Sequence, residues 1–174
     1  MNQVHLRPLR YKDANRLAQL ANNKKISMNL RDGFPYPYTL ADAKKFIEIC
    51  KNHTPVQVFA IECNGEYAGN IGLYPGEDVY RRSAEIGYFL GESYWGKGIM
   101  TKAVKQMVEY GFSNLNIVRI YTGVFEYNKA SQRVLEKCGF KKEAVFEKAI
   151  YKNHQLWNEV RFAILKPMLQ FNNP

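Results

Sequence analysis

The sequence predicts an α/β fold of the mixed α+β kind, in which one twisted, mostly antiparallel sheet is flanked by helices. Asn64-Gly65 lies between two apolar, strand-like runs, a pattern typical of a tight antiparallel hairpin. A strand–helix–strand pattern over residues 83–125 predicts one parallel strand pair with a right-handed crossover. The length of 174 residues suits one domain, so we expect residues 1–174 to fold as a single unit.

The first third of the chain is expected to be mainly helical. Residues 4–9 predict a short strand, and Asp13 stands where a helix cap is expected. The apolar face of that helix recurs at helical spacing, at Ala14, Leu17, Ala18 and Ala21. Residues 29–38 contain two prolines and a glycine, which predict an irregular segment. Thr39 then begins a second helix, with Asp42 as its capping-box partner.

The remaining elements alternate between strands and helices. Strands are expected at residues 56–63, 67–74, 83–90, 117–125, 140–146 and 157–165. Helices are expected at residues 101–112 and 128–138. We find no internal repeat, low-complexity tract or linker.

The composition limits the class of protein. Hydrophobic residues make up 46% of the chain and charged residues 24%, so disorder of the whole chain is not expected. The 25 Lys and Arg outnumber the 16 Asp and Glu, which gives a net charge of +9 that is spread along the chain. Such a charge favours polyanionic partners such as phosphates, RNA and acidic protein surfaces, but does not choose among them.

Cysteine usage indicates a reducing compartment, and the spacing of the histidines does not suit a metal site. Cys50, Cys63 and Cys138 form no CxxC pair, and an odd count without a disulfide framework suits a reducing cytoplasm. The three histidines lack metal-ligand spacing, so we expect no metal. We see no signal peptide and no stretch apolar enough to span a bilayer. We therefore expect a cytoplasmic protein with no membrane partner.

A glycine-bearing turn between a strand and a helix is the first candidate binding motif, Tyr94-Trp95-Gly96-Lys97-Gly98-Ile99-Met100-Thr101. Its glycines let the backbone approach a ligand, and the unpaired N–H groups of the first helical turn favour an anion. Lys97 adds a positive charge, and the Thr101 hydroxyl can donate to a phosphate or cap the helix. Alone, the motif is explained equally well by an ordinary turn with a helix cap, since it matches neither the Walker loop nor GxGxxG.

A second candidate motif follows the next strand. Asn128 lies at the carboxyl end of that strand, where open α/β sheets collect ligands. Ser131 comes one turn later on the same helix face. Asn128 is also a good helix cap, and the two roles are compatible.

Together these motifs resemble the GNAT superfamily of acetyltransferases, in the branch that includes the ribosomal-protein N-terminal acetyltransferases. The resemblance runs from Leu6-Arg7-Pro8-Leu9 to Phe162-Ala163-Ile164-Leu165. Its best-marked segments are Ala84-Glu85-Ile86-Gly87-Tyr88-Phe89-Leu90, Tyr94-Trp95-Gly96-Lys97-Gly98 and residues 128–140. It implies a sheet with a splayed parallel pair and acetyl-CoA as the cosubstrate.

The resemblance also implies where acetyl-CoA is held. Backbone N–H groups over residues 96–101 would bind the pyrophosphate, and the pantetheine arm would pair with residues 88–90 like an extra strand. The implied cofactor contacts are Tyr88, Phe89, Leu90, Trp95, Gly96, Lys97, Gly98, Ile99, Met100, Thr101, Asn128 and Ser131. The family pattern is Gln/Arg-x-x-Gly-x-Gly/Ala, and this chain departs from it with Trp95 and Met100. The bulkier Met100 changes how the loop wraps the phosphate, but the backbone donors remain.

Acetyl transfer to an amine needs a base, because an ammonium is not a nucleophile. Glu85 is the candidate base, and an ordinary salt bridge is an equal alternative for it. A backbone N–H in the strand over residues 88–90 is expected to stabilise the oxyanion. Tyr94, Tyr127 and Ser131 are candidate acids for the departing thiolate. Cys138 is better explained as a buried structural cysteine than as a nucleophile.

The acceptor is expected to bind near Phe34-Pro35-Tyr36-Pro37-Tyr38, whose aromatic residues, with Arg31 and Asp32, suit a pocket. An ordinary connecting loop is the alternative. The leading acceptor is a protein N-terminal α-amine, ribosomal or other, and a polyamine, amino acid or aminoglycoside is the second reading. A non-catalytic acyl-CoA sensor is a third reading. No RNA-binding signature supports direct nucleic-acid binding, and a monomer or a homodimer is expected.

Overall fold

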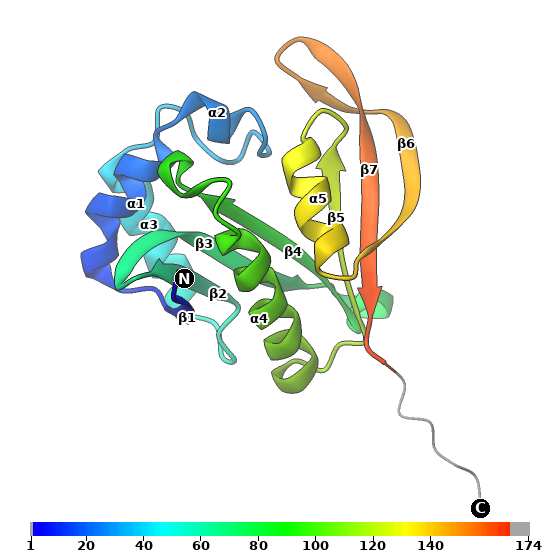
Figure 1. Cartoon of the computed structure of the whole chain (residues 1–174), viewed down its shortest axis with the longest axis horizontal. Coiled ribbons are helices and arrows are strands. Elements are labelled where there is room, and N and C mark those ends of the chain that lie inside the picture. The colour runs from blue at the N-terminus through cyan, green and yellow to red at the C-terminus, as the bar shows by residue number, and fades with distance from the viewer. Residues whose placement is uncertain (1, 168–174) are drawn as a thin grey trace, which may run out of the picture.

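Seven strands form one sheet in the computed structural model, which describes residues 2–167 (Figure 1). The strands are β1 (Val4–Pro8), β2 (Val58–Cys63), β3 (Glu66–Pro75), β4 (Ser83–Leu90), β5 (Arg119–Phe125), β6 (Lys141–Lys152) and β7 (Gln155–Leu165). Their order in the sheet is β1-β2-β3-β4-β5-β7-β6. The β4–β5 pair is parallel and every other pair in this order is antiparallel, which confirms the predicted mixed sheet.

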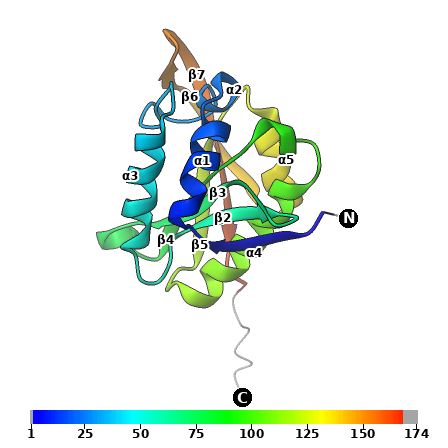
Figure 2. The same cartoon turned by 90° about the vertical axis from the view of Figure 1, so that its left-hand side faces the viewer.

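Helices cover both faces of this sheet (Figure 2). The helices are α1 (Ala14–Ala21), α2 (Lys24–Ser27), α3 (Leu40–Lys51), α4 (Ile99–Asn114) and α5 (Lys129–Lys137), with short 3-10 turns η1 (Tyr11–Asp13), η2 (Asp78–Tyr80) and η3 (Glu92–Tyr94). Within residues 2–167, no helix is both long and apolar enough to cross a membrane.

Two apolar cores result from the alternation of side chains along the strands. Ile86 of β4 and Ile120 of β5 pack against α4 and α5 on one face. Phe89 of β4 packs with α1 and α3 on the other. Each fully buried side chain of this kind, such as Ile86, stabilises the fold by about 1.5–3 kcal/mol. The two faces of β4 therefore meet different surroundings, which matters for the site below.

Local signals predicted helix α3 well and the C-terminal hairpin less well. The Thr39 hydroxyl accepts from the Asp42 N–H at 3.2 Å, and Asp42 accepts from the Thr39 N–H at 2.8 Å, which confirms the capping box. Strands β6 and β7 extend beyond the expected ranges because Asn153 and His154, with φ of 52° and 61°, turn the chain within two residues. Helix α2 was not expected.

Asp13 has a different role from the predicted helix cap. Its side chain makes no capping hydrogen bond to α1 and instead accepts two hydrogen bonds from the Arg7 guanidinium, both at 2.8 Å. The Arg10 N–H adds a third at 2.8 Å, and Arg7 Nε also donates to Glu62 at 2.6 Å. Burial raises the pKa of Asp13, but these hydrogen bonds outweigh it and leave the pKa below its usual value. The network ties β1 and β2 to the start of α1.

The Asp13→Asn variant tests this network. Loss of the buried carboxylate leaves Arg7 with Glu62 alone, and we expect the free energy of unfolding to fall by about 2 kcal/mol at pH 7. The lowered pKa makes this contribution complete above about pH 4 and progressively lost below it, so the two proteins should converge on acidification. Urea unfolding between pH 3 and 7 measures both effects. Glu92→Gln, in an exposed pair with Lys25, is the control and should change stability little.

Candidate active site

The central strands β4 and β5 pair over only a short length and then separate (Figure 1). Their parallel register joins Ser83–Glu85 to residues 119–121, with Glu85 beside Tyr121. From Ile86 onward, β4 has β3 on one side and no strand on the other within the described chain. An open backbone edge therefore lies in the middle of the sheet.

The hydrogen bonds between β3 and β4 determine which groups line this edge. The Gly91 N–H donates to the Ala68 carbonyl, and the Gly76 N–H donates to the Ser83 carbonyl. Because bonded pairs alternate along an antiparallel ladder, the odd-numbered residues of β4 face β3. The C=O group of Ile86, both backbone groups of Tyr88 and the N–H group of Leu90 then face the gap. This is the backbone pattern that an extended ligand with its own amide groups requires.

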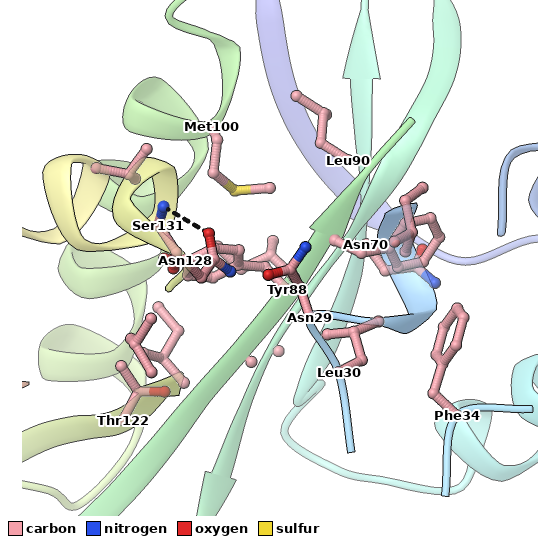
Figure 3. Close-up of a pocket in the computed structure, with 18 of the residues that line it drawn as sticks. Asn29, Leu30, Phe34, Asn70, Tyr88, Leu90, Met100, Thr122, Asn128 and Ser131 are labelled. Atoms are coloured by element: carbon pink, nitrogen blue, oxygen red, sulfur yellow. Dashed lines mark hydrogen bonds between the residues drawn. The ribbon is translucent and has the colours of Figure 1, made fainter. Parts of the chain in front are cut away.

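A cavity of about 1200 Å³ includes this gap and extends to both faces of the sheet (Figure 3). Ser131 and Asn128 lie on one side of it, and Asn70 and Phe34 lie on the other. The first turn of α4 and the segment over residues 28–39 complete its walls. The structure thus brings together the glycine turn, the start of α5, Glu85 and the aromatic segment, which are far apart in the sequence.

The glycine turn presents backbone donors to this cavity. Gly96 and Gly98 have φ of 72° and 73°, in the left-handed region that favours glycine, and Gly98 precedes the first turn of α4. The first helical hydrogen bond runs from the Lys102 N–H to the Gly98 carbonyl. The N–H groups of residues 96–101 have no acceptor among the described residues, and together with the helix dipole they are suited to an anion.

Side chains of the turn support its shape. The Trp95 indole N–H donates to the Leu90 carbonyl at 2.7 Å and so fixes the turn to the end of β4. The Lys97 ammonium donates to the Ser93 carbonyl at 2.7 Å, so its charge lies back on the turn. Met100 is buried and lines the cavity beside Thr101. Despite this departure from the small residue of the family pattern, the backbone N–H groups of the turn remain without an acceptor among the described residues.

The start of α5 carries a hydroxyl pair. Asn128 caps the helix by accepting from the Ser131 N–H at 3.1 Å, and it lines the cavity as well, so both predicted roles are compatible with its position. Ser131 Oγ lies 2.8 Å from Tyr88 Oη and shares a hydrogen bond with it. Burial raises the pKa of Tyr88, which keeps its phenol protonated. Two neutral hydroxyls are therefore held together at the gap.

Glu85 lies on the opposite face of β4 from Tyr88. Its side chain is 23% exposed and pairs with Arg31 at 2.5 Å, and the Arg31 side chain is 76% exposed. The salt bridge considered from the sequence is therefore present, with a largely exposed partner. Burial raises the pKa of both Tyr38 and Tyr74, which line the same end of the cavity, to about 12. Neither phenol is therefore a base near pH 7.

The other candidate acids bond elsewhere. The Tyr94 hydroxyl accepts from Arg16 at 3.3 Å and donates to Glu66 at 3.0 Å, although its ring lines the cavity. The Tyr127 hydroxyl donates to the Met28 carbonyl at 2.5 Å. These contacts direct both hydroxyls to groups outside the gap and leave Ser131 as the candidate beside Tyr88.

Cys138 has the surroundings of a structural cysteine. The Cys138 thiol is half-buried and donates to the Thr101 carbonyl at 3.4 Å. Burial raises its pKa, which disfavours the thiolate that a nucleophile needs. In residues 2–167 no group of three or more His, Cys, Asp or Glu side chains is placed to hold a metal ion.

Two polar residues that line the cavity, Asn70 and Glu159, were not predicted from the sequence. Asn70 of β3 is 4% exposed and accepts from the Tyr67 hydroxyl at 2.7 Å, while its Nδ2 has no acceptor among the described residues. The signal in the sequence that could have identified Asn70 is a single amide side chain within an otherwise largely apolar strand. Glu159 of β7 lines the cavity too, and no local pattern linked it to residues so distant in sequence.

Comparisons with known proteins agree with this geometry. The family model described as an acetyltransferase (GNAT) domain matches residues 3–141. Spermidine N(1)-acetyltransferase of Escherichia coli K12 is 32% identical over 171 residues, which cover 95% of this chain and 87% of the relative.

Solved structures show the same fold. RimL, a ribosomal L7/L12 α-N-protein acetyltransferase in complex with coenzyme A, superposes with a TM-score of 0.81 at 24% identity, covering 94% of each chain. MccE, a microcin C7 self-immunity acetyltransferase in complex with acetyl-CoA and AMP, has a TM-score of 0.78 at 27% identity and covers 94% of this chain and 92% of its own. The chain belongs to the GNAT family of acetyl-CoA-dependent N-acetyltransferases.

Proposed function

We propose that this enzyme transfers the acetyl group of acetyl-CoA to the N-terminal α-amine of a protein or peptide. The observation that carries the proposal is the gap between β4 and β5, which joins the backbone donors of residues 96–101 to Glu85 on the opposite face. The two substrates would enter from opposite faces of the sheet and meet in the gap. The free thiols Cys50, Cys63 and Cys138 support the proposed cytoplasmic location.

Acetyl-CoA would supply the acetyl group as an activated thioester. The N–H groups of residues 96–101 are suited to bind its pyrophosphate, and the gap-facing backbone of Tyr88 and Leu90 is suited to pair with its amide-bearing arm. The Ser131 hydroxyl, held by Tyr88, would keep a proton at Oγ for the leaving sulfur. These roles use the cofactor residues and the acid expected from the sequence.

On the acceptor side, Glu85 would take the proton from the acceptor ammonium. It pairs with Arg31, whose side chain is exposed, so Arg31 can swing away when an amine arrives. Direct proton transfer and transfer through one water are both compatible with its place beside the gap.

The charge of the cavity supports an acceptor with a single cation. Apart from Arg133 and Lys137 of α5, the charged lining residues balance, with Lys25, Arg31 and Lys45 against Asp42, Glu85 and Glu159. A polyamine carries several positive charges and would need an excess of carboxylates. The unpaired Asn70 Nδ2–H also matches a peptide, because a peptide carbonyl accepts a hydrogen bond and a protonated amine does not.

A polyamine is the second candidate acceptor. The 32% identical relative from Escherichia coli is a spermidine N(1)-acetyltransferase. A spermidine N-acetyltransferase from Vibrio cholerae, solved with CoA and spermine, also has the same fold, with a TM-score of 0.79 at 24% identity over 94% of this chain and 96% of that one.

A panel of amines decides between these acceptors. We expect acetyl-CoA turnover with peptides that have a free N-terminus, with a kcat/KM about 10-fold or more above that for spermidine. Release of CoA thiol, with mass detection of the acetylated product, measures it. The same peptides with acetylated N-termini are the controls and should give no turnover. Preferential turnover of spermidine would replace the peptide proposal with the polyamine one.

The Glu85→Gln and Arg31→Gln variants test the base. Loss of the carboxylate should lower kcat roughly 10²-fold or more on the best acceptor, with the Kd for acetyl-CoA unchanged. Loss of Arg31 should preserve most of kcat, because it removes only the partner of the base. If Glu85 served the ion pair alone, the two variants would lose activity equally, and the assignment of Glu85 as base would be wrong.

A further inference from the structure

A second carboxylate faces the acceptor side of the sheet. Val160 and Phe162 of β7 belong to the core beneath α4 and α5. Side chains alternate along a strand, so Glu159 and Arg161, which flank Val160, face the opposite side of the sheet. Glu85 faces that side as well, because its neighbours Ala84 and Ile86 belong to the α4 core. Both carboxylates line the same cavity.

The absence of a side chain at Gly123 makes room for this carboxylate. A Cβ built on Gly123 would lie 2.4 Å from Glu159 Cδ and 2.6 Å from each carboxylate oxygen. The Glu159 carboxyl group therefore lies directly over the backbone of β5. Gly123 is two residues beyond Tyr121, the register partner of Glu85, so this carboxyl group lies where the two strands begin to separate.

Arg161 holds the carboxylate in this position. Its Nη2 donates to Glu159 Oε1 at 2.6 Å, and its guanidinium lies 5.3 Å from the ring centroids of both Tyr121 and Phe146. The second oxygen, Oε2, has no donor among the described residues, although the side chain is only 18% exposed. A shielded carboxylate with one free oxygen, fixed in direction, is a strong acceptor for a charged N–H group.

We propose that Glu159 binds the ammonium group of the acceptor and positions it for Glu85. This rests on the proposed function, and it assigns to Glu159 a contact separate from proton removal. The two carboxylates differ in their partners, which suits this division. Arg31 beside Glu85 is 76% exposed, whereas Arg161 beside Glu159 is 27% exposed and lies against two aromatic rings. A fixed carboxylate can hold the amine while the carboxylate with the movable partner takes its proton.

The matched variants Glu159→Gln and Glu143→Gln test the assignment. Glutamine at residue 159 keeps the size of the side chain and an oxygen for Arg161 but removes the charge. Glu143 is the control, because it pairs with Arg119 on the same sheet and does not line the cavity. With an active acceptor, we expect Glu159→Gln to raise the KM for the amine about 10-fold or more. The KM for acetyl-CoA should be unchanged, and Glu143→Gln should behave as wild type.

A binding measurement keeps this test independent of turnover. Trialanine amide carries one ammonium and no carboxylate, and its titration by NMR into the CoA-saturated protein reports the acceptor site alone. We expect Glu159→Gln to weaken its binding about 10-fold or more relative to Glu143→Gln, while the N-acetylated peptide binds all three proteins alike. Equal binding to the two variants, or no binding to wild type, would overturn the role of Glu159. Binding that depends on Glu159 without acetylation of any panel amine would support that role and count against the proposed function.

Discussion

The separation of β4 from β5 beyond Glu85 and Tyr121 is the constraint on which the site depends. In a continuous sheet the Ile86 carbonyl, both backbone groups of Tyr88 and the Leu90 N–H would be paired with a neighbouring strand. Here they face a cavity, where unpaired backbone groups are costly unless a ligand or water satisfies them. The sheet therefore carries a ready template for an extended, amide-bearing ligand, and the gap is a passage between its two faces.

The two faces supply different chemistry to that passage. On the α4 and α5 side the groups are donors: the backbone N–H groups of residues 96–101, the hydroxyls of Tyr88 and Ser131, and the cationic side chains of Arg133 and Lys137. The other side supplies carboxylates, those of Glu85 and Glu159, each paired with an arginine. This asymmetry follows from strand alternation, because Tyr88 and Glu85 lie on the same strand but face opposite sides. It suits a phosphate-bearing thioester on one face and an amine on the other.

The parts of the structure that local patterns determine could be predicted from the sequence. The Thr39 capping box, the glycine turn before α4 and the cap at Asn128 each involve residues within a few positions of one another. The contacts that were missed join distant segments: Glu159 lies over Gly123, and Asn70 lies opposite the segment over residues 28–39. Asp13 failed as a predicted cap because Arg7, on the neighbouring strand, supplies stronger donors than the helix N–H groups. The hydrophobic periodicity of one segment does not indicate which residue of a distant segment will contact it.

Amide hydrogen exchange with and without saturating CoA tests the central role of the gap most directly. The account predicts slower exchange on CoA binding at the N–H groups of residues 96–101 and at Tyr88 and Leu90, with little change in the odd-numbered residues of β4 that already bond to β3. Protection confined to another surface, or CoA binding without any slowing at these amides, would contradict the claim that the separated strands receive the cosubstrate.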